Sequence, residues 1–598
     1  MTKLPVVLAF LIGNVLLAEE PTLPPEAFAL LPGTLMEPTK PNEEEGTITE
    51  IAEGWRLKSP GTLEKSYNLS VSRKFTEPIA KDQVCLFVIT ARTVESDEVD
   101  GKGRVTATVQ NTADYSATPL WKNWVIGSEW ETTYFSFQAT HDLPEGAGVA
   151  KVNVGEARQI VEIADFQVYR FPVGFDPFLA PRMKVTYGGR ELDAPWRMEA
   201  AERIEKHRKG DWTIGVVDVA GKPIEGVKIK VAMQRHLFGF GSAVDVNMLS
   251  GLGSTLSDDD ATRYRNTVDE LFSRIVPENG LRPLNLEAPA DPARPWDEDT
   301  RRRTRAAVQW TLQWAQDHKM SSRGHYLVWG YVEPWSRKEL EKGGTVGLLA
   351  AYDRHFDFVI PFCDPYVEEW DALNHPVPFV EADALYNIID ENFYPDIYRK
   401  IRPMTDKLLF VNEDTFNSDR AAAFGKHIRH MIDEDVTPDG CGFQSHFSDH
   451  AIPDITEEWT NWETFGAMVK YLTVTEYDLQ TLDDQLHADH LRDMLTMAFS
   501  HPQMTGFLMW GFWEGRHWKP TAALFKKDWT ERPAVQVWRD LVLGEWATNA
   551  DLVTDAEGFA PSRAFYGWYE VTLEKDGKTV TKQVLHGQNG GKPIFTME

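Results

Sequence analysis

Short apolar runs alternate with longer amphipathic segments between about residues 236 and 545. Eight of the runs have the length of buried strands: 236–244, 274–280, 323–330, 367–374, 407–413, 440–447, 471–479 and 505–512. Between several of them apolar residues recur at helical spacing, as Val308 and Leu312 do beside Trp310 and Trp314. Eight strands alternating with helices over this span is the number and size of a (β/α)₈ TIM barrel, which we therefore predict.

On both sides of this region the alternation has period two, which is typical of strands. Runs from 46 to 172, separated by Gly, Pro and Asp turns, predict an antiparallel β-sandwich of the jelly-roll type. Residues 19–45 are rich in Pro and Glu without periodicity and predict a linker. Residues 173–235 contain a hairpin pattern around AGKP and predict a small connecting β-layer against the barrel. The tail, 546–598, predicts a small β appendage.

The first residues, MTKLPVVLAFLIGNVLLAEEP, have the pattern of a secretory signal peptide. Lys3 gives a positive start, residues 4–17 are apolar, and Ala18 is a small residue before Glu19, although Leu16 is bulky for a cleavage site. We therefore expect a signal peptide at 1–18 and a secreted or periplasmic protein. No other stretch approaches the roughly 18 consecutive apolar residues of a membrane span, so we expect none.

Composition narrows the classes of partner. A net charge of −29 and a pI near 5.0 argue against nucleic acid and anionic membranes, which need Lys/Arg patches. Aromatic residues are 12% of the chain, with 21 Trp; most should be structural, but the excess suits stacking on sugar rings. Three cysteines, Cys85, Cys363 and Cys441, are too few and odd in number for a disulfide framework. No motif has metal-ligand spacing, so no metal site is expected.

Polar and aromatic residues gather where the predicted barrel strands end, which is where barrel enzymes carry their sites. Seven of the eight strands end in such residues: Glu278 and Asn279, His325 and Trp329, Asn374 and His375, Asn412 and Glu413, Gln444 and His446, Glu476, and Trp510. Amides, imidazoles, carboxylates and indoles at one rim predict a site that binds hydroxyl groups and stacks rings.

These segments resemble the motifs of glycoside hydrolase family 10, the xylanase type. The quoted segments, in chain order, are RGHYLVWGYVEPW, EEWDALNH, CGFQSH, VTEYD and MWGFWEGRHW followed by ALFKKDWTERPAVQVW. The resemblance covers about 235–545 and implies a retaining hydrolase of internal β-1,4 bonds in xylan or a related polysaccharide, acting as a monomer without a cofactor. The segments GSEWETTYFSFQA and IADFQVYRF resemble jelly-roll carbohydrate-binding modules, with Trp121, Trp124 and Trp130 as candidate sugar platforms.

The resemblance also implies roles for single residues. Glu476 would be the nucleophile, and Asn374 would hold the sugar 2-hydroxyl group. Gln444 and His446 would orient the nucleophile. Further substrate contacts would come from Glu278, Asn279, Arg282, His325, Trp329, Trp510 and Trp518. For each of these supporting residues, ordinary packing or hydrogen bonding at the barrel rim is the alternative interpretation.

Two positions depart from the family pattern. His375 stands where the family has its acid/base glutamate, and Gly330 stands where it usually has a histidine. A general acid typically raises the rate about 10²- to 10⁴-fold. Replacing the acid/base glutamate by His375 could therefore change the activity strongly.

Three interpretations of His375 stay open. In the first it is the general acid, since the unperturbed pKa of an imidazole is about 6.5; its added positive charge would then favour an anionic glycan, such as a uronate- or sulfate-bearing chain. In the second, hydrolysis is lost and the chain is a glycan-binding protein on the same fold. In the third, His375 is structural and another residue, or the substrate's own carboxyl group, supplies the proton. A metal site of His325, His375 and His446 is a further alternative that no known spacing supports.

Overall fold

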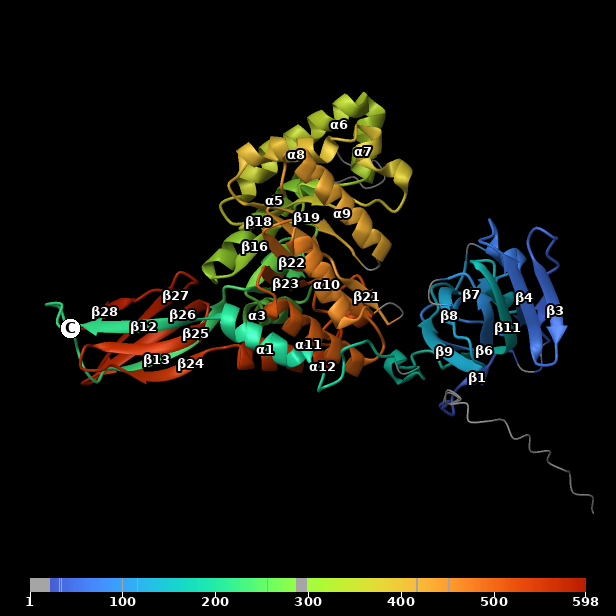
Figure 1. The fold of residues 1–598 in the computed structure, drawn as a ribbon, viewed down its shortest axis with the longest axis horizontal. Coiled ribbons are helices and arrows are strands. Elements are labelled where there is room, and N and C mark those ends of the chain that lie inside the picture. The colour runs from blue at the N-terminus through green and yellow to red at the C-terminus, as the bar shows by residue number, and fades with distance from the viewer. Residues whose placement is uncertain are drawn as a thin grey trace, which may run out of the picture. The chain divides into compact units, whose positions relative to one another are not determined.

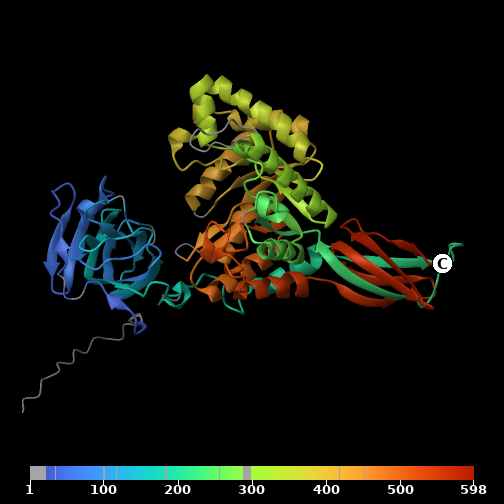
Figure 2. The same ribbon diagram turned by 180° about the vertical axis from the view of Figure 1, so that it is seen from behind.

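The computed structural model describes residues 22–598, except 32, 34, 99–100, 116, 182, 184, 255, 287–297, 416–417 and 450–451. The expected signal peptide, 1–18, lies outside the described residues. The chain forms two compact units, the first ending at Val185 and the second comprising Thr186–Glu598 (Figures 1 and 2). Within the described part of the chain, no helix is both long and apolar enough to cross a membrane.

The first unit is a sandwich of two antiparallel sheets, as the period-two alternation predicted. One sheet has the order β3-β4-β11-β6-β9, with β1 paired to β11, and the other has the order β2-β5-β10-β7-β8. Alternate residues, among them Leu57, Phe87, Val105 and Val161, are almost fully buried between the sheets. The strands are β1 Phe28–Ala29, β2 Glu37–Pro38, β3 Thr47–Ile51, β4 Gly54–Pro60, β5 Ser70–Phe75, β6 Val84–Ser96, β7 Gly103–Asn111, β8 Leu120–Ile126, β9 Glu131–Gln138, β10 Gly148–Asn153 and β11 Arg158–Arg170.

The segment 19–45, which composition predicted to be a linker, contributes to this sandwich. Its strand β1 pairs with β11 and its strand β2 pairs with β5. Leu30 and Leu31 follow β1 and are 3% and 1% exposed, so they belong to the core. Two adjacent apolar residues are too short a signal to outweigh the surrounding Pro and Glu, but their burial is enough to attach the segment.

The second unit contains the predicted (β/α)₈ barrel. Its parallel strands have the order β16-β15-β14-β23-β22-β20-β19-β18-β17, and pairing of β16 with β18 closes the sheet. All eight predicted strands are present, two of them continued by the short strands β17 and β21. They are β14 Gly239–Val244, β15 Arg274–Pro277, β16 Ser321–Gly324, β17 Val328–Trp329, β18 Glu369–Asn374, β19 Leu408–Glu413, β20 Gly440–Phe443, β21 His446–Ser448, β22 Tyr471–Gln480 and β23 Met504–Met509.

Helices surround the barrel sheet (Figure 1). Side-chain caps start several of them: Asp245, Ser257, Asp454 and Asp483 each accept hydrogen bonds from backbone N–H groups of the first turn. The helices of the unit are α1 Trp196–His207, α2 Val246–Ser250, α3 Asp258–Leu271, α4 Pro283–Leu286, α5 Glu298–Asp317, α6 Pro334–Cys363, α7 Leu385–Ile388, α8 Phe393–Ile401, α9 Ser418–Asp433, α10 Ile455–Gly466, α11 Asp484–Ser500 and α12 Pro533–Trp538.

The segment before the barrel and the tail after it form one β-sandwich, not the two separate layers that the sequence predicted. The strands β12 Lys209–Val217 and β13 Lys228–His236 do not pair as a hairpin. β12 pairs with β25 and β28, and β13 with β24 and β26, so the two strands lie in different sheets (Figures 1 and 2). The other strands are β24 Asn549–Val553, β25 Phe559–Phe565, β26 Gly567–Lys575, β27 Lys578–His586 and β28 Ile594–Thr596.

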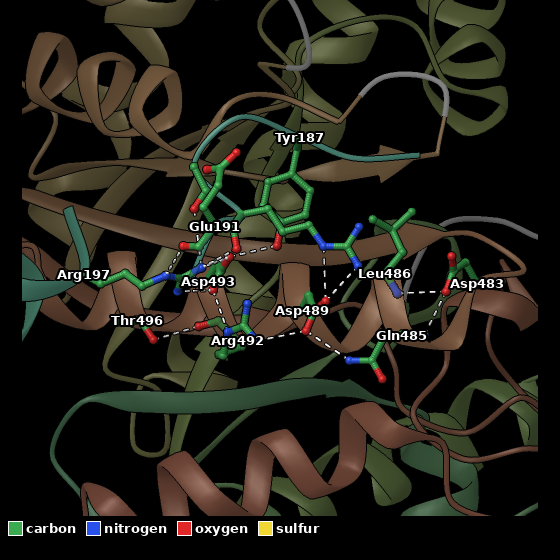
Figure 3. A network of polar contacts seen from close by, with 12 residues as sticks. Tyr187, Glu191, Arg197, Asp483, Gln485, Leu486, Asp489, Arg492, Asp493 and Thr496 are labelled. Atoms are coloured by element: carbon green, nitrogen blue, oxygen red, sulfur yellow. Dashed lines mark hydrogen bonds and ion pairs between the residues drawn. The ribbon is translucent and has the colours of Figure 1, made fainter. Parts of the chain in front are cut away.

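The sequence pattern did not predict the helix α1. The segment that contains it forms hydrogen bonds and ion pairs with the barrel helix α11 (Figure 3). The hydroxyl group of Tyr187 donates to Oδ2 of Asp493 at 2.8 Å, and Arg197 pairs with the same carboxylate at 2.6 Å. Arg492 pairs with Asp489 at 2.9 Å within α11. Because α11 follows β22 directly, this network holds the helix behind the strand that carries Glu476.

Candidate active site

Glu476 lies inside the barrel on β22 and is only 4% exposed. Its Oε1 accepts a hydrogen bond from Nδ2 of Asn412 at 2.7 Å, and its Oε2 lies 3.4 Å from Nε2 of His446. Thr475 donates to Oδ1 of Asn412 at 2.7 Å, which fixes the amide with its N–H₂ group toward the carboxylate. Both carboxylate oxygens are therefore held in place, one by a residue of β19 and the other by a residue of β21.

A buried chain of charges continues from this carboxylate. Nδ1 of His446 lies 2.9 Å from Oδ2 of Asp478, which in turn accepts from Nε1 of Trp518 at 2.8 Å. Lys519 donates to the other oxygen of Asp478 at 2.9 Å. The imidazole thus bridges two carboxylates of one strand, and the outer carboxylate is fully paired.

The pKa values of these hydrogen-bonded side chains favour their charged forms at neutral pH. Burial lowers the pKa of His446, but the charges and hydrogen bonds of Asp478 and Glu476 outweigh it and raise the pKa to about 10. Burial raises the pKa of Asp478, yet His446 and Lys519 bring it down to about 2. For Glu476 burial is likewise opposed, by its hydrogen bond to His446 and the charges of His325 and His446, and its pKa lies below the ordinary value. Glu476 is therefore a carboxylate, the form that a nucleophile requires.

Three side-chain amides link Glu476 to the end of β18. Asn412 donates to Oδ1 of Asn374 at 2.8 Å as well as to Glu476. Gln444 donates to the same oxygen at 3.1 Å. These amides lie at the ends of β18, β19 and β20, and the structure therefore brings together residues that the sequence placed at separate strand ends.

Both ring nitrogens of His375 are bonded within the protein. Nδ1 lies 3.1 Å from Oε1 of Glu413, which also accepts from Arg420 at 2.8 Å, so Nδ1 is the donor. Nε2 lies 3.0 Å from the amide nitrogen of Gln444 and is the acceptor. In this arrangement the ring presents no N–H group to a substrate, because its one proton points at Glu413.

The two departures from the family pattern, at 330 and 375, depend on one another. His375 has a left-handed backbone with φ of 55°, and its carbonyl oxygen approaches β17 closely. A Cβ atom added at Gly330 would lie 2.2 Å from that oxygen, far inside van der Waals contact. A histidine at 330 is therefore incompatible with the backbone that His375 adopts here.

Aromatic rings lie on both sides of this row of polar side chains. The ring of Trp329 lies 4.6 Å from that of His375, centroid to centroid, and the Arg282 guanidinium lies 5.5 Å from the Trp329 centroid. On the other side Trp510 lies 4.9 Å from His325, and Trp518 lies 4.9 Å from His446. Trp518 is 54% exposed, so its face is accessible to a ligand.

The remaining sequence-predicted residues also lie at this end of the barrel. Glu278 and Asn279 follow β15, and Asn279 donates to Oε1 of Glu278 at 2.9 Å. Burial raises the pKa of Glu278, and the charge of Asp245 adds to this against the opposing charge of Arg516. His325 is fully buried with Nδ1 2.8 Å from Asp371, so it supports the site from below.

Sequence reasoning assigned no role to Asp478, Lys519 or Phe379. The first could have been found, because Glu476 and Asp478 are two residues apart on a strand and so share a face. Lys519 reaches Asp478 from a loop beyond β23, and such a contact leaves no periodic signal. Phe379 is 64% exposed beside His375, with ring centroids 6.0 Å apart, on a Pro-rich segment without a pattern.

The metal alternative gains no support from these contacts. His325, His375 and His446 each direct Nδ1 to a different carboxylate, those of Asp371, Glu413 and Asp478. Among the residues that the structure describes, no group of three or more His, Cys, Asp or Glu could hold a metal ion.

A closed barrel with a buried carboxylate, an amide chain and flanking indoles at its strand ends is the architecture of a glycoside hydrolase. Residues 229–541, just over half of the chain, match the model of glycosyl hydrolase family 10, and the chain belongs to this family.

The chain spans about half or less of the length of the relatives that it matches, and nearly the whole length of a matching solved structure. The chain is 25% identical over 420 residues to the anti-sigma-I factor RsgI6 of Acetivibrio thermocellus, covering 70% of this chain and 52% of that protein. It is 22% identical over 294 residues to endo-1,4-beta-xylanase 2 of Arabidopsis thaliana, covering 47% of this chain and 26% of that protein. The structure of xylanase 10B from Thermotoga petrophila in complex with xylobiose matches at 18% identity and a TM-score of 0.44, over 52% of this chain and 95% of that one.

Proposed function

We propose that this protein is a retaining endo-hydrolase of β-1,4-linked xylan or a related polysaccharide, with Glu476 as its nucleophile. One observation carries the proposal: Glu476 is a buried carboxylate whose two oxygens are held by Asn412 and His446. A fixed, ionised carboxylate can attack an anomeric carbon without first losing a proton or reorienting. The family supports the reaction class, and the particular substrate is part of the proposal.

The surrounding residues have roles that follow from their contacts. Asn374 would hold the sugar 2-hydroxyl group, and Gln444 would hold Asn374 in place through their 3.1 Å hydrogen bond. The imidazolium of His446 would stabilise Glu476 as a carboxylate when it leaves the anomeric carbon. Trp329, Trp510 and Trp518 would pack against sugar rings, and Glu278, Asn279 and Arg282 would bind more distant sugars. The polymeric substrate fits the export that we infer from residues 1–18.

Release of reducing sugar from a panel of polysaccharides tests this function. We expect the full chain to cleave xylan, and Glu476→Ala to release none above background. The panel should pair neutral xylan with its glucuronate-bearing form, because His375 acting as a charged general acid would favour the second. Equal rates on the two forms would contradict that preference, and no cleavage of any β-1,4-linked polysaccharide would contradict the hydrolase assignment.

A second candidate function is glycan binding without hydrolysis. The observation that favours it is the bonding of both nitrogens of His375, which leaves the usual acid/base position without a proton to give. The likeness to a protein named as an anti-sigma factor is compatible with a regulatory use of such a barrel. An aryl glycoside with a good leaving group separates the two candidates, because it needs no proton and would be cleaved by any chain with a working Glu476.

We further propose that the first unit binds glycans on the outer face of the sheet β2-β5-β10-β7-β8. In register across this face lie Lys151, Thr108 and Trp121, with Asn153 and Thr106 in the next row. Thr108 and Asn153 are themselves buried, so the exposed groups of this face are the ones that a ligand would contact. Trp121 is 56% exposed, which supports its use as a stacking platform.

Replacing Trp121 by Ala should weaken binding of the full chain to insoluble xylan about two- to thirteenfold. The reason is that an aromatic contact is worth about 0.5 to 1.5 kcal/mol beyond its buried area. Binding is measured by depletion from solution in a Glu476→Ala background, so that hydrolysis does not interfere. Phe28→Ala is the matched control, since Phe28 is 47% exposed on the opposite sheet. Equal binding by the Trp121→Ala chain and its parent would refute this surface.

A further inference from the structure

Asp414 is a buried carboxyl group that the proposed function leaves without a role. It follows Glu413, the last residue of β19, and so lies at the end of the barrel where the site is built. It is 8% exposed, and its Oδ1 accepts no hydrogen bond from any described residue. Glu413, in contrast, accepts hydrogen bonds from His375, Arg420 and two backbone N–H groups. A buried carboxyl oxygen that accepts no hydrogen bond from a described residue disfavours the anion, so Asp414 is suited to hold a proton.

A second buried carboxyl group, that of Glu458 on α10, lies near Asp414. On the same face of α10, Asn461 donates to Oγ1 of Thr415 at 3.2 Å, which sets this helix face against the residue next to Asp414. Glu458 is 5% exposed. Burial raises the pKa of Glu458 to about 8, and the negative charge of Asp414 contributes to that rise.

Asp414 has ionisable neighbours on several elements around the site. They are His375 after β18, Glu413 on β19, Arg420 on α9, His446 on β21 and Glu458 on α10. Burial raises the pKa of Asp414 to about 6; the charge of Glu413 adds to this, and those of His446, His375 and Arg420 oppose it. Asp414 is therefore coupled to His375 and His446, and it carries its proton at mildly acidic pH.

We propose that Asp414 is the acid–base catalytic residue of this barrel, in place of the glutamate that the family has at the position of His375. This inference rests on the proposed function. Glu476 attacks the anomeric carbon, the bond to the glycosidic oxygen breaks, and that oxygen takes the proton of Asp414. Water then attacks the anomeric carbon, its proton passes to the Asp414 carboxylate, and the bond to Glu476 breaks, which restores both groups. Glu458 keeps its own proton while Asp414 titrates, because its pKa is the higher of the two, at about 8.

The test compares two substrates of the full chain that share a glycone and differ in leaving group. Xylo-oligosaccharide has an alkoxide leaving group and needs the acid, whereas dinitrophenyl β-xylobioside does not. Asp414→Asn should lower kcat/KM on the oligosaccharide about 10²- to 10⁴-fold and on the dinitrophenyl substrate less than tenfold. Retained activity on the second substrate shows that the variant is folded. Azide should raise the variant's kcat on that substrate by forming the glycosyl azide, since no carboxylate repels it.

The pH profile distinguishes a residue that donates the proton from one that only supports the structure of the site. Activity on the oligosaccharide should fall as pH rises through about 6, because Asp414 must be protonated to act. Asp414→Asn should remove this alkaline limb, whereas Glu458→Gln should keep it, because Glu458 is itself uncharged in this pH range. Glu457→Gln, an exposed neighbour on the same helix, should leave the limb in place.

These outcomes distinguish failure of the proposed function from failure of the role assigned to Asp414. If the wild-type chain cleaves the dinitrophenyl substrate and Glu476→Ala does not, the proposed function stands. If Asp414→Asn then retains wild-type activity on the oligosaccharide, Asp414 is not the acid; loss of that activity in His375→Asn alone would assign the role to His375. If the wild-type chain cleaves neither substrate, the proposed function fails and this inference fails with it.

Discussion

Replacing Glu476 by Gln should lower kcat on a dinitrophenyl xylobioside by about 10⁴-fold or more. Loss of a catalytic nucleophile has effects of this order, because the reaction then lacks its covalent intermediate. Gln keeps the size of the side chain, and its amide oxygen can still accept the hydrogen bond of Asn412. The loss therefore reports the missing carboxylate and not a cavity. Initial rates of dinitrophenol release give the measurement.

Two further readouts make this result specific to position 476. The Glu476→Gln chain should bind xylo-oligosaccharides with an affinity near that of the wild type, as titration calorimetry would show. A fluorinated xylobioside that forms a slowly hydrolysed intermediate should label the wild-type chain on a peptide containing Glu476. Label on another carboxylate, or a wild-type rate in Glu476→Gln, would remove Glu476 from the mechanism.

The barrel could be predicted from the sequence because its signals are periodic and repeated. Each strand is a short apolar run, and eight such runs between amphipathic helices leave one common architecture. The positions of the strand ends then followed, and with them residues such as Asn374, Gln444 and Glu476, which the structure joins through hydrogen bonds. Local pattern and global fold agree in this part of the chain.

The pairing of strands outside the barrel could not be predicted in this way. The alternation around AGKP identified β12 and β13 correctly as strands, but a period-two pattern does not state which strand is the neighbour. The connection between them is long enough for each to join a different sheet, and their partners lie more than 300 residues later. Non-local partners of this kind leave no mark in either segment alone.

The sequence also could not predict how single side chains of the site depend on one another. Sequence comparison marks Gly330 and His375 as two independent departures, whereas the structure makes them one, because the carbonyl of His375 occupies the space beside Gly330. Asp414 was not singled out, since an acidic residue after a strand is common and its burial depends on α10. Burial and hydrogen bonding, which decide the chemistry of a carboxyl group, are properties of the folded chain.

Replacing Arg323 by Met should destabilise the second unit by about 3 to 5 kcal/mol, the usual cost of breaking a buried ion pair from one side. Arg323 is fully buried on β16 and pairs with both Glu369 and Asp371 of β18. Arg274 pairs with Glu369 at 2.9 Å, so that carboxylate keeps one partner. Among the described residues, the remaining side-chain partner of Asp371 is the ring of His325. The free energy of unfolding is measured by urea denaturation of the full chain at neutral pH.

The effect of Arg323→Met should depend on pH in a direction that the structure fixes. Burial raises the pKa of Asp371, but the charge of Arg323 and the hydrogen bond to His325 outweigh it, and the pKa lies below its ordinary value. A carboxyl group with a lowered pKa stabilises the fold at pH values above its unfolded-state pKa of about 3.9. This stabilisation is lost as the pH falls through the pKa of the folded state. Without Arg323 the pKa of Asp371 rises, so the difference between variant and wild type should shrink as pH falls toward 5. The exposed Arg303→Met is the control and should change stability by less than about 0.5 kcal/mol; an Arg323→Met chain as stable as the control would show that this buried network does not support the barrel.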